Sequence, residues 1–258
     1  MRKALEVQFY PETDFGGFSR VDGTIAFYTR VNALLRPEYT VLDIGCGRGA
    51  HTEDKVPYRK NLVSFKGKVE RVIGIDVDPN AAANPTLDDF RLIEGARWPV
   101  DDLSIDLARC DFVLEHIENP AGFFAECARV IKPGGYLCIR TPNRHGYVAA
   151  LSRLIPERFH QRILNRAQGG TRQEADVFRT HYRCNTRGAL ERHLTRSGFT
   201  HVVYAYEAEP SYLRFSAAAY AFGKLLAAVS PPCFRNALFC FARRNDEGTA
   251  VPCSASKE

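Results

Sequence analysis

The chain has 258 residues and a formal net charge of +5, with 45% hydrophobic and 25% charged residues. This length suits one α/β domain with appendages or two small domains, and the composition is that of an ordinary globular protein. The charge falls short of the dense basic surface of a nucleic-acid-binding protein, and the apolar stretches end before membrane-spanning length. No continuous apolar segment follows the N-terminus, so we expect no signal peptide and a cytoplasmic location.

The eight cysteines are scattered along the chain, without a C-x-x-C pair or a His/Cys cluster at zinc spacing. We therefore expect neither a disulfide framework nor a metal site. Cys138 and Cys240 stand inside apolar runs, where a free thiol behaves as a small buried hydrophobic residue.

Residues 1–37 form an N-terminal lead-in, and its first part is rich in aromatic residues and turn formers, as expected of a lid. The apolar spacing from Gly23 to Leu35 predicts a helix that Pro37 ends. Arg20 and Tyr28 are placed to face a ligand from this region, although a solvated side chain is the commoner role for such residues.

Residues 40–50 read TVLDIGCGRGA. The apolar first half predicts a buried strand, and Gly45, Gly47 and Gly49 allow the backbone to turn tightly and to approach a ligand closely. The carboxylate of Asp43, at the end of the strand, is placed to accept hydrogen bonds from a ligand's ammonium group or from loop amides. A tight turn without a ligand is the alternative that this stretch alone leaves open.

The segment after the turn, residues 51–68, predicts a crossover helix that Pro57 interrupts. It is basic, and its cations are Lys55, Arg59, Lys60, Lys66 and Lys68. The next buried strand, 69–78, contains Asp76 at its end, where an acid of a βαβ unit is placed to hold the two hydroxyl groups of a ribose. Both strand-end acids therefore point into one crevice.

Further strands and helices alternate along the rest of the core. We predict strands over 90–95, 106–113 and 136–140, and a helix over 120–131 that ends at Lys-Pro-Gly-Gly. Ala96 and Arg97 follow the third strand in a loop where an adenine ring would lie. This alternation predicts an α/β fold with a doubly wound, mostly parallel sheet.

The C-terminal part has weaker patterns. An amphipathic stretch over 147–164 and a polar loop over 167–176 precede a capped helix over 186–198, and strands follow over 199–207 and 237–243. The nearly uncharged stretch 212–230 predicts a helix. The sequence favours a helix that covers the sheet edge over one that docks on a membrane interface or forms a homodimer. Residues 245–258 predict a disordered tail.

Taken in order, DIGCGRG, GIDVD, DFVLEHI and IKPGGYLCIRTPN resemble the class I S-adenosylmethionine-dependent methyltransferases, in particular a broad bacterial small-molecule and surface-glycan group. The resemblance covers about residues 38–145. It implies S-adenosylmethionine (SAM) as cofactor and a Rossmann-like, seven-stranded sheet with an antiparallel last strand. It also implies a SAM-binding core over 38–145, and residues 146–244 would complete the sheet and form a substrate cap.

The resemblance further assigns roles by position. The glycine turn contacts the methionine part of SAM, the acid of the second strand binds the ribose, and residues after the third strand contact adenine. The end of the fourth strand lies near the methionine part. The residues assigned to the cofactor are Asp43, Gly45, Gly47, Gly49, Asp76, Val77, Ala96, Arg97, Cys110 and Asp111.

Methyl transfer from a sulfonium is an in-line displacement in which the protein mainly aligns the reactants. A hydroxyl acceptor also needs a general base. His116, in the L-E-H segment after the fourth strand, is the first candidate, and His181 is the second; for a loop histidine, bonding to the backbone is the alternative role. The further candidates for substrate contact are Arg140, Asn143, His145 and Tyr182.

The sequence thus predicts a SAM-dependent methyltransferase that modifies a small molecule, a sugar or a lipid-linked glycan, at oxygen. The alternatives are an RNA or protein methyltransferase that uses the basic insertion, and a non-catalytic SAM-binding scaffold. CDFVLEH stands where methyltransferases of DNA bases carry D/N-P-P-Y, so DNA is disfavoured. The spacing G-x-G-x-G, without the final glycine of the dinucleotide motif, disfavours a dehydrogenase.

Overall fold

The computed structural model of the chain describes residues 5–147, 149 and 179–246, and it contains one seven-stranded sheet in the order β3-β2-β1-β4-β5-β7-β6. Only the pairs that β7 makes, with β5 and β6, are antiparallel. The predicted mostly parallel sheet with an antiparallel last strand is therefore confirmed. The strands are β1 (Thr40–Ile44), β2 (Arg71–Asp76), β3 (Asp89–Leu92), β4 (Ile105–Asp111), β5 (Ile131–Pro142), β6 (Phe199–Tyr206) and β7 (Ala237–Arg244).

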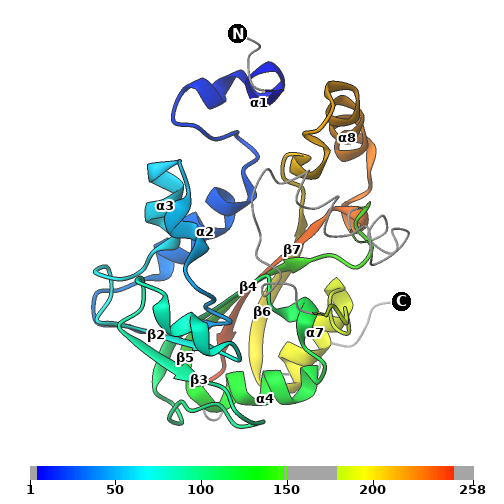
Figure 1. The fold of residues 1–258 in the computed structure, drawn as a ribbon. Helices are drawn as coiled ribbons and strands as arrows, with labels where there is room; N and C mark the ends of the chain where they lie inside the picture. The colour runs from blue at the N-terminus through cyan, green and yellow to red at the C-terminus, as the bar shows by residue number, and fades with distance from the viewer. Residues whose placement is uncertain (1–4, 148, 150–178, 247–258) are drawn as a thin grey trace.

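Helices cover both faces of the sheet (Figure 1). On one face, apolar side chains of α4 and α7 pack against β1, β4 and β5, and on the other face α2 and α3 do so. The α-helices described are α1 (Leu5–Phe9), α2 (Gly23–Leu34), α3 (Pro57–Val63), α4 (Pro120–Val130), α7 (Arg187–Arg196) and α8 (Ala217–Val229). The short 3-10 helices are η1 (Pro11–Asp14), η2 (Ala50–Glu53), η3 (Pro79–Ala83), η4 (Leu114–His116), η6 (Ser211–Leu213) and η7 (Pro232–Phe234).

Three of the predicted helices begin at a side-chain cap. Asp22, Asn119 and Thr186 accept hydrogen bonds from backbone amides in the first turns of α2, α4 and α7. Such caps satisfy amides that have no partner within the helix, and each typically contributes about 1 kcal/mol. The residue types at the N-terminal ends of these three helices are therefore those expected from the sequence.

The crossover segment differs from the prediction. Pro57 does not interrupt a helix but occupies the first turn of α3, where its missing N–H costs nothing. The 3-10 helix η2 precedes it, so the crossover consists of two short pieces. Arg59 of α3 pairs with Asp54 at 2.5 Å and with Asp22 at 2.7 Å, which ties the crossover to the start of α2.

The lead-in docks on α8 (Figure 1). Tyr220 of α8 is buried against Phe9 and Tyr10, with ring centroids 5.0 Å and 6.4 Å apart, and Lys224 donates to the carbonyl oxygen of Phe9. The buried side of α8 thus covers the lead-in. The sequence analysis instead favours a helix that covers the edge of the sheet. No helix in the described ranges is long and apolar enough to cross a membrane.

Several C-terminal predictions lie outside the described residues. These are most of the amphipathic stretch 147–164, the polar loop 167–176, and the tail from residue 247 onward. The seven described cysteines are free thiols, and all but Cys233 are buried.

Candidate active site

The glycine turn joins β1 to η2, and its three glycines adopt positive φ angles of 66°, 52° and 79°. A Cβ atom on Gly45 would lie 2.3 Å from a methyl group of Val113, and one on Gly49 would lie 2.6 Å from the side-chain oxygen of Asn84. A Cβ atom on Gly47 would meet no described atom within 4 Å. Gly45 and Gly49 therefore allow close packing, and Gly47 exposes bare backbone to open space where a ligand can approach.

Asp76, at the end of β2, fixes this turn from the neighbouring strand. One carboxylate oxygen accepts from the amide of Gly47 at 2.9 Å and the other accepts from the amide of Asp78 at 2.9 Å. Each oxygen keeps a second lone pair, so the carboxylate can still accept the hydroxyl groups of a ribose. The predicted role of Asp76 fits its position.

Val77, predicted beside Asp76, and the residues predicted near the adenine are exposed. Val77 is 58% exposed. Ala96 is also exposed, and the exposed Arg97 pairs with Asp102 at 2.9 Å. Their contacts with the cofactor stay a prediction.

Two ion pairs, one buried and one partly buried, lie side by side across the three central strands. Asp43 of β1 stands opposite Arg109 of β4, and its two oxygens accept from Arg109 at 2.7 Å and 2.5 Å. Asp111 at the end of β4 stands opposite Arg140 of β5, and both of its oxygens accept from Arg140 at 2.6 Å. Lateral neighbours in a parallel sheet are close enough for such two-pronged contacts.

Tyr28 of α2 joins the two pairs. Its hydroxyl accepts from Arg109 at 3.1 Å and donates to Asp111 at 2.8 Å. Thr24, one turn earlier, accepts from Arg140 at 2.9 Å. The lead-in helix is thereby bonded to the carboxyl edge of the sheet, and Tyr28, although predicted as a substrate contact, is 1% exposed.

The electrostatics of this network follow from burial and pairing. Burial alone raises the pKa of Asp111, but the adjacent guanidinium of Arg140 brings that pKa below its ordinary value. Burial raises the pKa of the Tyr28 hydroxyl and of the thiols of Cys46 and Cys110. At neutral pH Asp111 is therefore ionised and paired, whereas the tyrosine and thiols stay protonated.

Replacement of Arg109 tests how much the network contributes to the free energy of unfolding. We expect Arg109→Met to lower the free energy of unfolding by about 3–5 kcal/mol, because Asp43 would remain buried without a partner. The double variant Asp43→Asn/Arg109→Met should recover part of that loss in urea denaturation. Arg187→Met, which breaks an exposed pair with Glu191, is the matched control and should change stability by less than about 1 kcal/mol. Equal losses for the buried and exposed pairs would contradict this picture.

The L-E-H segment forms η4, directly after β4. Glu115 is buried, its carboxylate accepts from Thr141 at 3.1 Å, and its backbone oxygen accepts from the amides of His181 and Tyr182. Nδ1 of His116 lies 3.0 Å from the carbonyl oxygen of Arg179, which only accepts, so Nδ1 carries the hydrogen. In the neutral form of the ring the lone pair is then on Nε2, which lies 4.0 Å from Oε1 of the buried Glu115. The structure brings both predicted histidines to one place.

The remaining predicted substrate contacts are dispersed. Asn143 is buried, and its amide group donates to the carbonyl oxygens of Cys233 and Arg235, which holds the end of β5 to the loop before β7. His145 is exposed. Arg20 is exposed on the lead-in and pairs with Glu12 at 3.4 Å.

Three features of the edge were missed in the sequence. Arg109 is a charge inside an apolar strand, a signal that could have revealed it. Phe112 is 45% exposed with a positive φ of 54°, and the Arg140 guanidinium lies 4.8 Å from its ring centroid. Such backbone strain in a bulky residue clusters at functional sites, but no sequence pattern announces it. The third missed feature is His51, which lies on η2.

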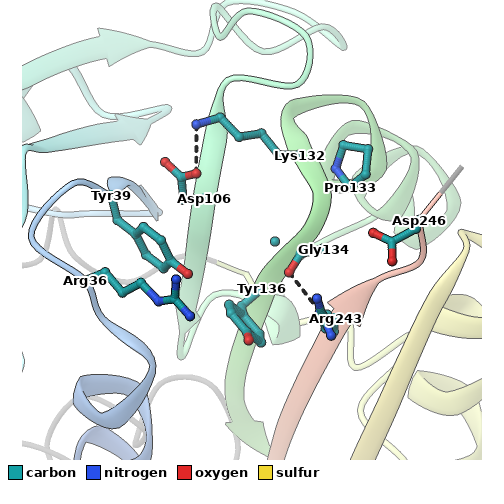
Figure 2. Close-up of a pocket in the computed structure, with 10 residues that line it drawn as sticks. Arg36, Tyr39, Asp106, Lys132, Pro133, Gly134, Tyr136, Arg243 and Asp246 are labelled. Carbon is teal, nitrogen blue, oxygen red and sulfur yellow. Dashed lines mark hydrogen bonds and ion pairs between the residues drawn. The ribbon is translucent and has the colours of Figure 1, made fainter.

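The K-P-G-G turn lies at the opposite, amino edge of the sheet. It borders a cavity of about 270 Å³, where Lys132 pairs with Asp106 at 2.7 Å and Arg243 donates to the carbonyl oxygen of Gly134 (Figure 2). The seven residues of β4 separate the two edges by about 20 Å. K-P-G-G therefore forms the first part of β5 and does not line the crevice of the glycine turn.

A family model described as a methyltransferase domain matches residues 21–204. The chain belongs to this family. The predicted resemblance to class I SAM-dependent methyltransferases is thereby confirmed, and SAM is the cofactor of the group. The bare backbone at Gly47 and the remaining lone pairs of Asp76 fit such a ligand.

Two curated relatives show the range of the family. The probable S-adenosylmethionine-dependent methyltransferase of Mycolicibacterium smegmatis is 34% identical over 133 residues, which are 50% of this chain and 47% of that protein. The ubiquinone biosynthesis O-methyltransferase of Hahella chejuensis is 32% identical over 118 residues, which are 42% of this chain and 45% of that protein. The chain thus spans about half the length of the curated relatives it matches.

Solved structures share the fold of this methyltransferase. A SAM-dependent methyltransferase from Methanosarcina mazei has a TM-score of 0.52 at 21% identity, with 84% of this chain and 98% of that chain covered. A second, from Mesorhizobium loti, has a TM-score of 0.50 at 20% identity, with 85% and 98% covered.

The ribose role of Asp76 is open to a direct test. We expect Asp76→Ala to weaken the binding of S-adenosylhomocysteine by about 10- to 100-fold in calorimetry, the loss typical of a charge-assisted hydrogen bond. Asp89→Ala on the neighbouring β3, whose acid pairs with Arg71 and Arg91, is the control and should bind normally. Unchanged affinity in Asp76→Ala would remove this residue from the site.

Proposed function

We propose that this methyltransferase transfers the methyl group of SAM to a hydroxyl group of a small molecule, a sugar or a lipid-linked glycan. The observation that carries the proposal is the position of His116 in η4, directly after β4 at the carboxyl edge. Ligands of doubly wound folds bind at this edge. The Hahella chejuensis relative is named as an O-methyltransferase, which supports oxygen as the acceptor atom.

SAM supplies a methyl group already bonded to a good leaving group, so the residues of the chain need only align the acceptor and receive its proton. Alignment of this kind can contribute about 7–11 kcal/mol. Asp43 accepts hydrogen bonds from Arg109, Asp111 accepts from Arg140, and the Tyr28 hydroxyl donates to Asp111. His116 is therefore the best-placed proton acceptor of the edge, and His181 beside it is the second.

A cavity of about 150 Å³ lies between the lead-in, the start of α3 and the segment after β6. Ser19 donates to Glu209 in this cavity at 3.1 Å, and burial together with Asp22 raises the pKa of Glu209. The lead-in would act as the lid, and residues 146–244 would supply the rest of the substrate cap.

The basic insertion gives less support to an RNA or protein acceptor. Arg59 is engaged by Asp54 and Asp22, Lys66 pairs with Asp88 at 3.6 Å, and Lys68 donates to Asn32 at 3.1 Å. Three of the five cations of the insertion thus have partners within the fold, whereas Lys55 and Lys60 are exposed. A non-catalytic scaffold is distinguished from an enzyme by transfer of labelled methyl groups into a cell extract.

The base role of His116 predicts a selective loss of turnover. We expect His116→Gln to lower methyl transfer into extract components by about 10²–10⁴-fold and to leave S-adenosylhomocysteine affinity unchanged. His201→Gln is the matched control, because its Nδ1 also lies near a carbonyl oxygen, that of Phe199 at 3.2 Å, but on β6. Full turnover in His116→Gln would eliminate the base role while leaving the family assignment intact.

We further propose that the outer face of α8 contacts a membrane interface. Phe215, Phe222, Leu225, Val229 and Phe234 are each at least 50% exposed. Residues 210–236 contain Arg and Lys but no acidic residue, which suits an anionic surface.

Vesicle sedimentation tests this contact. We expect the protein to sediment with anionic phosphatidylglycerol vesicles, and Phe222→Asp/Leu225→Asp to lose most of that binding, because two charges would enter the interface. Val202→Asp, which changes an exposed residue of β6, is the control and should sediment normally. A stable homodimer in light scattering that the double variant dissolves would show instead that a second copy covers this face.

A further inference from the structure

Asp43, the acid placed to receive a ligand's ammonium group, is already engaged. Both of its oxygens accept from Arg109, and both side chains are almost completely buried, with 4% and 7% exposed. The pair carries no net charge, and its guanidinium repels another cation. The ammonium group of a SAM molecule therefore needs a further hydrogen-bond acceptor.

His51 follows the glycine turn and has a buried nitrogen without a hydrogen-bond partner among the described residues. It belongs to η2, two residues after Gly49. The buried nitrogen is Nε2. A buried polar atom left in this state costs about 1–3 kcal/mol, which a hydrogen bond to a ligand would recover.

The charged groups that face His51 come from three parts of the fold. Arg109, Asp43 and Asp111 face it from the sheet, Lys60 faces it from α3, and Asp54 follows it on the chain. Burial lowers the pKa of His51, and Arg109 lowers it further. The imidazole is therefore neutral at pH 7, with one ring nitrogen that can accept a hydrogen bond.

We infer that His51 accepts a hydrogen bond from the α-ammonium group of the methionine part of SAM. The inference rests on the proposed cofactor pocket, in which Asp76 of β2 receives the ribose. The opposite end of the ligand then extends across the glycine turn toward β1 and β4, where Asp43 and Arg109 face His51. A neutral acceptor suits this place, because a third carboxylate would have to be desolvated next to Asp43 and Asp111.

Such a contact makes cofactor binding depend on pH. The pKa of His51 lies below its ordinary value in the free pocket, so the ring stays neutral and accepting above about pH 6.5. As the pH falls through that pKa, the imidazolium that forms repels the ammonium group. Affinity should therefore be constant at neutral pH and should fall in acid.

Calorimetry with two ligands tests the inference. S-adenosylhomocysteine carries the α-ammonium group, and 5′-methylthioadenosine has the same nucleoside without the amino acid. We expect His51→Leu to weaken S-adenosylhomocysteine binding by about tenfold at pH 8, as for one lost hydrogen bond, and 5′-methylthioadenosine binding by less than about twofold. Equal losses for the two ligands, or no loss for either, would overturn the inference.

The conservative variant supplies a second readout. The amide oxygen of His51→Gln still accepts, so this variant should keep the affinity at pH 8 and abolish the weakening that the wild type shows in an acid titration. His193→Gln, which removes another histidine of lowered pKa, on α7 against Phe124, should retain it. If His51→Leu does not fold, the pH dependence of S-adenosylhomocysteine binding by His51→Gln alone tests the inference. A loss of affinity in acid equal to that of the wild type would overturn it.

The outcome also separates this inference from the proposed function. Wild-type protein that binds neither ligand would overturn both. Wild-type protein and His51→Leu that bind S-adenosylhomocysteine equally well would overturn only the role of His51.

Discussion

The two Asp–Arg pairs set the geometry on which the rest of the site depends. Asp43 stands opposite Arg109, and Asp111 stands opposite Arg140, so β1, β4 and β5 match their charges only in one register. A shift of one residue would turn the side chains to the other face of the sheet and leave charges unpaired in the core. Since the glycine turn follows β1 and the L-E-H segment follows β4, this register also positions both functional loops.

The same pairs couple the lead-in to the sheet. Tyr28 and Thr24 of α2 bond to the network, and Asp22 caps α2 while it pairs with Arg59 of α3. The proposed lid is therefore anchored at the carboxyl edge through polar contacts. Its earlier part, α1, is held instead by the aromatic and cation contacts of α8.

The sequence revealed the parts of this arrangement that are local. The strand–glycine turn, Asp76 and the capped helices depend on residues a few positions apart, and all lie where they were predicted. The partner of Asp43 is 66 residues away in the chain, and the Phe9 oxygen that Lys224 bonds is 215 residues away. Periodicity and composition carry no information about such contacts, so neither the ion pairs nor the docking of the lead-in on α8 was predicted. Asn143 shows the same limit, because its amide group looked available for a substrate but holds two backbone carbonyl groups.

The pairing of Asp43 and Asp111 with arginines has a consequence for the proposed reaction. The positive charge of a sulfonium is concentrated in the reactant and becomes dispersed as the methyl group moves toward the acceptor oxygen. An unpaired carboxylate nearby would stabilise the reactant more than the transition state and would slow the transfer. Arg109 and Arg140 remove that effect by engaging Asp43 and Asp111 fully. What the edge then has to provide is a place for the acceptor's proton, and that requirement points to a histidine such as His116 more strongly than to any acid of the network.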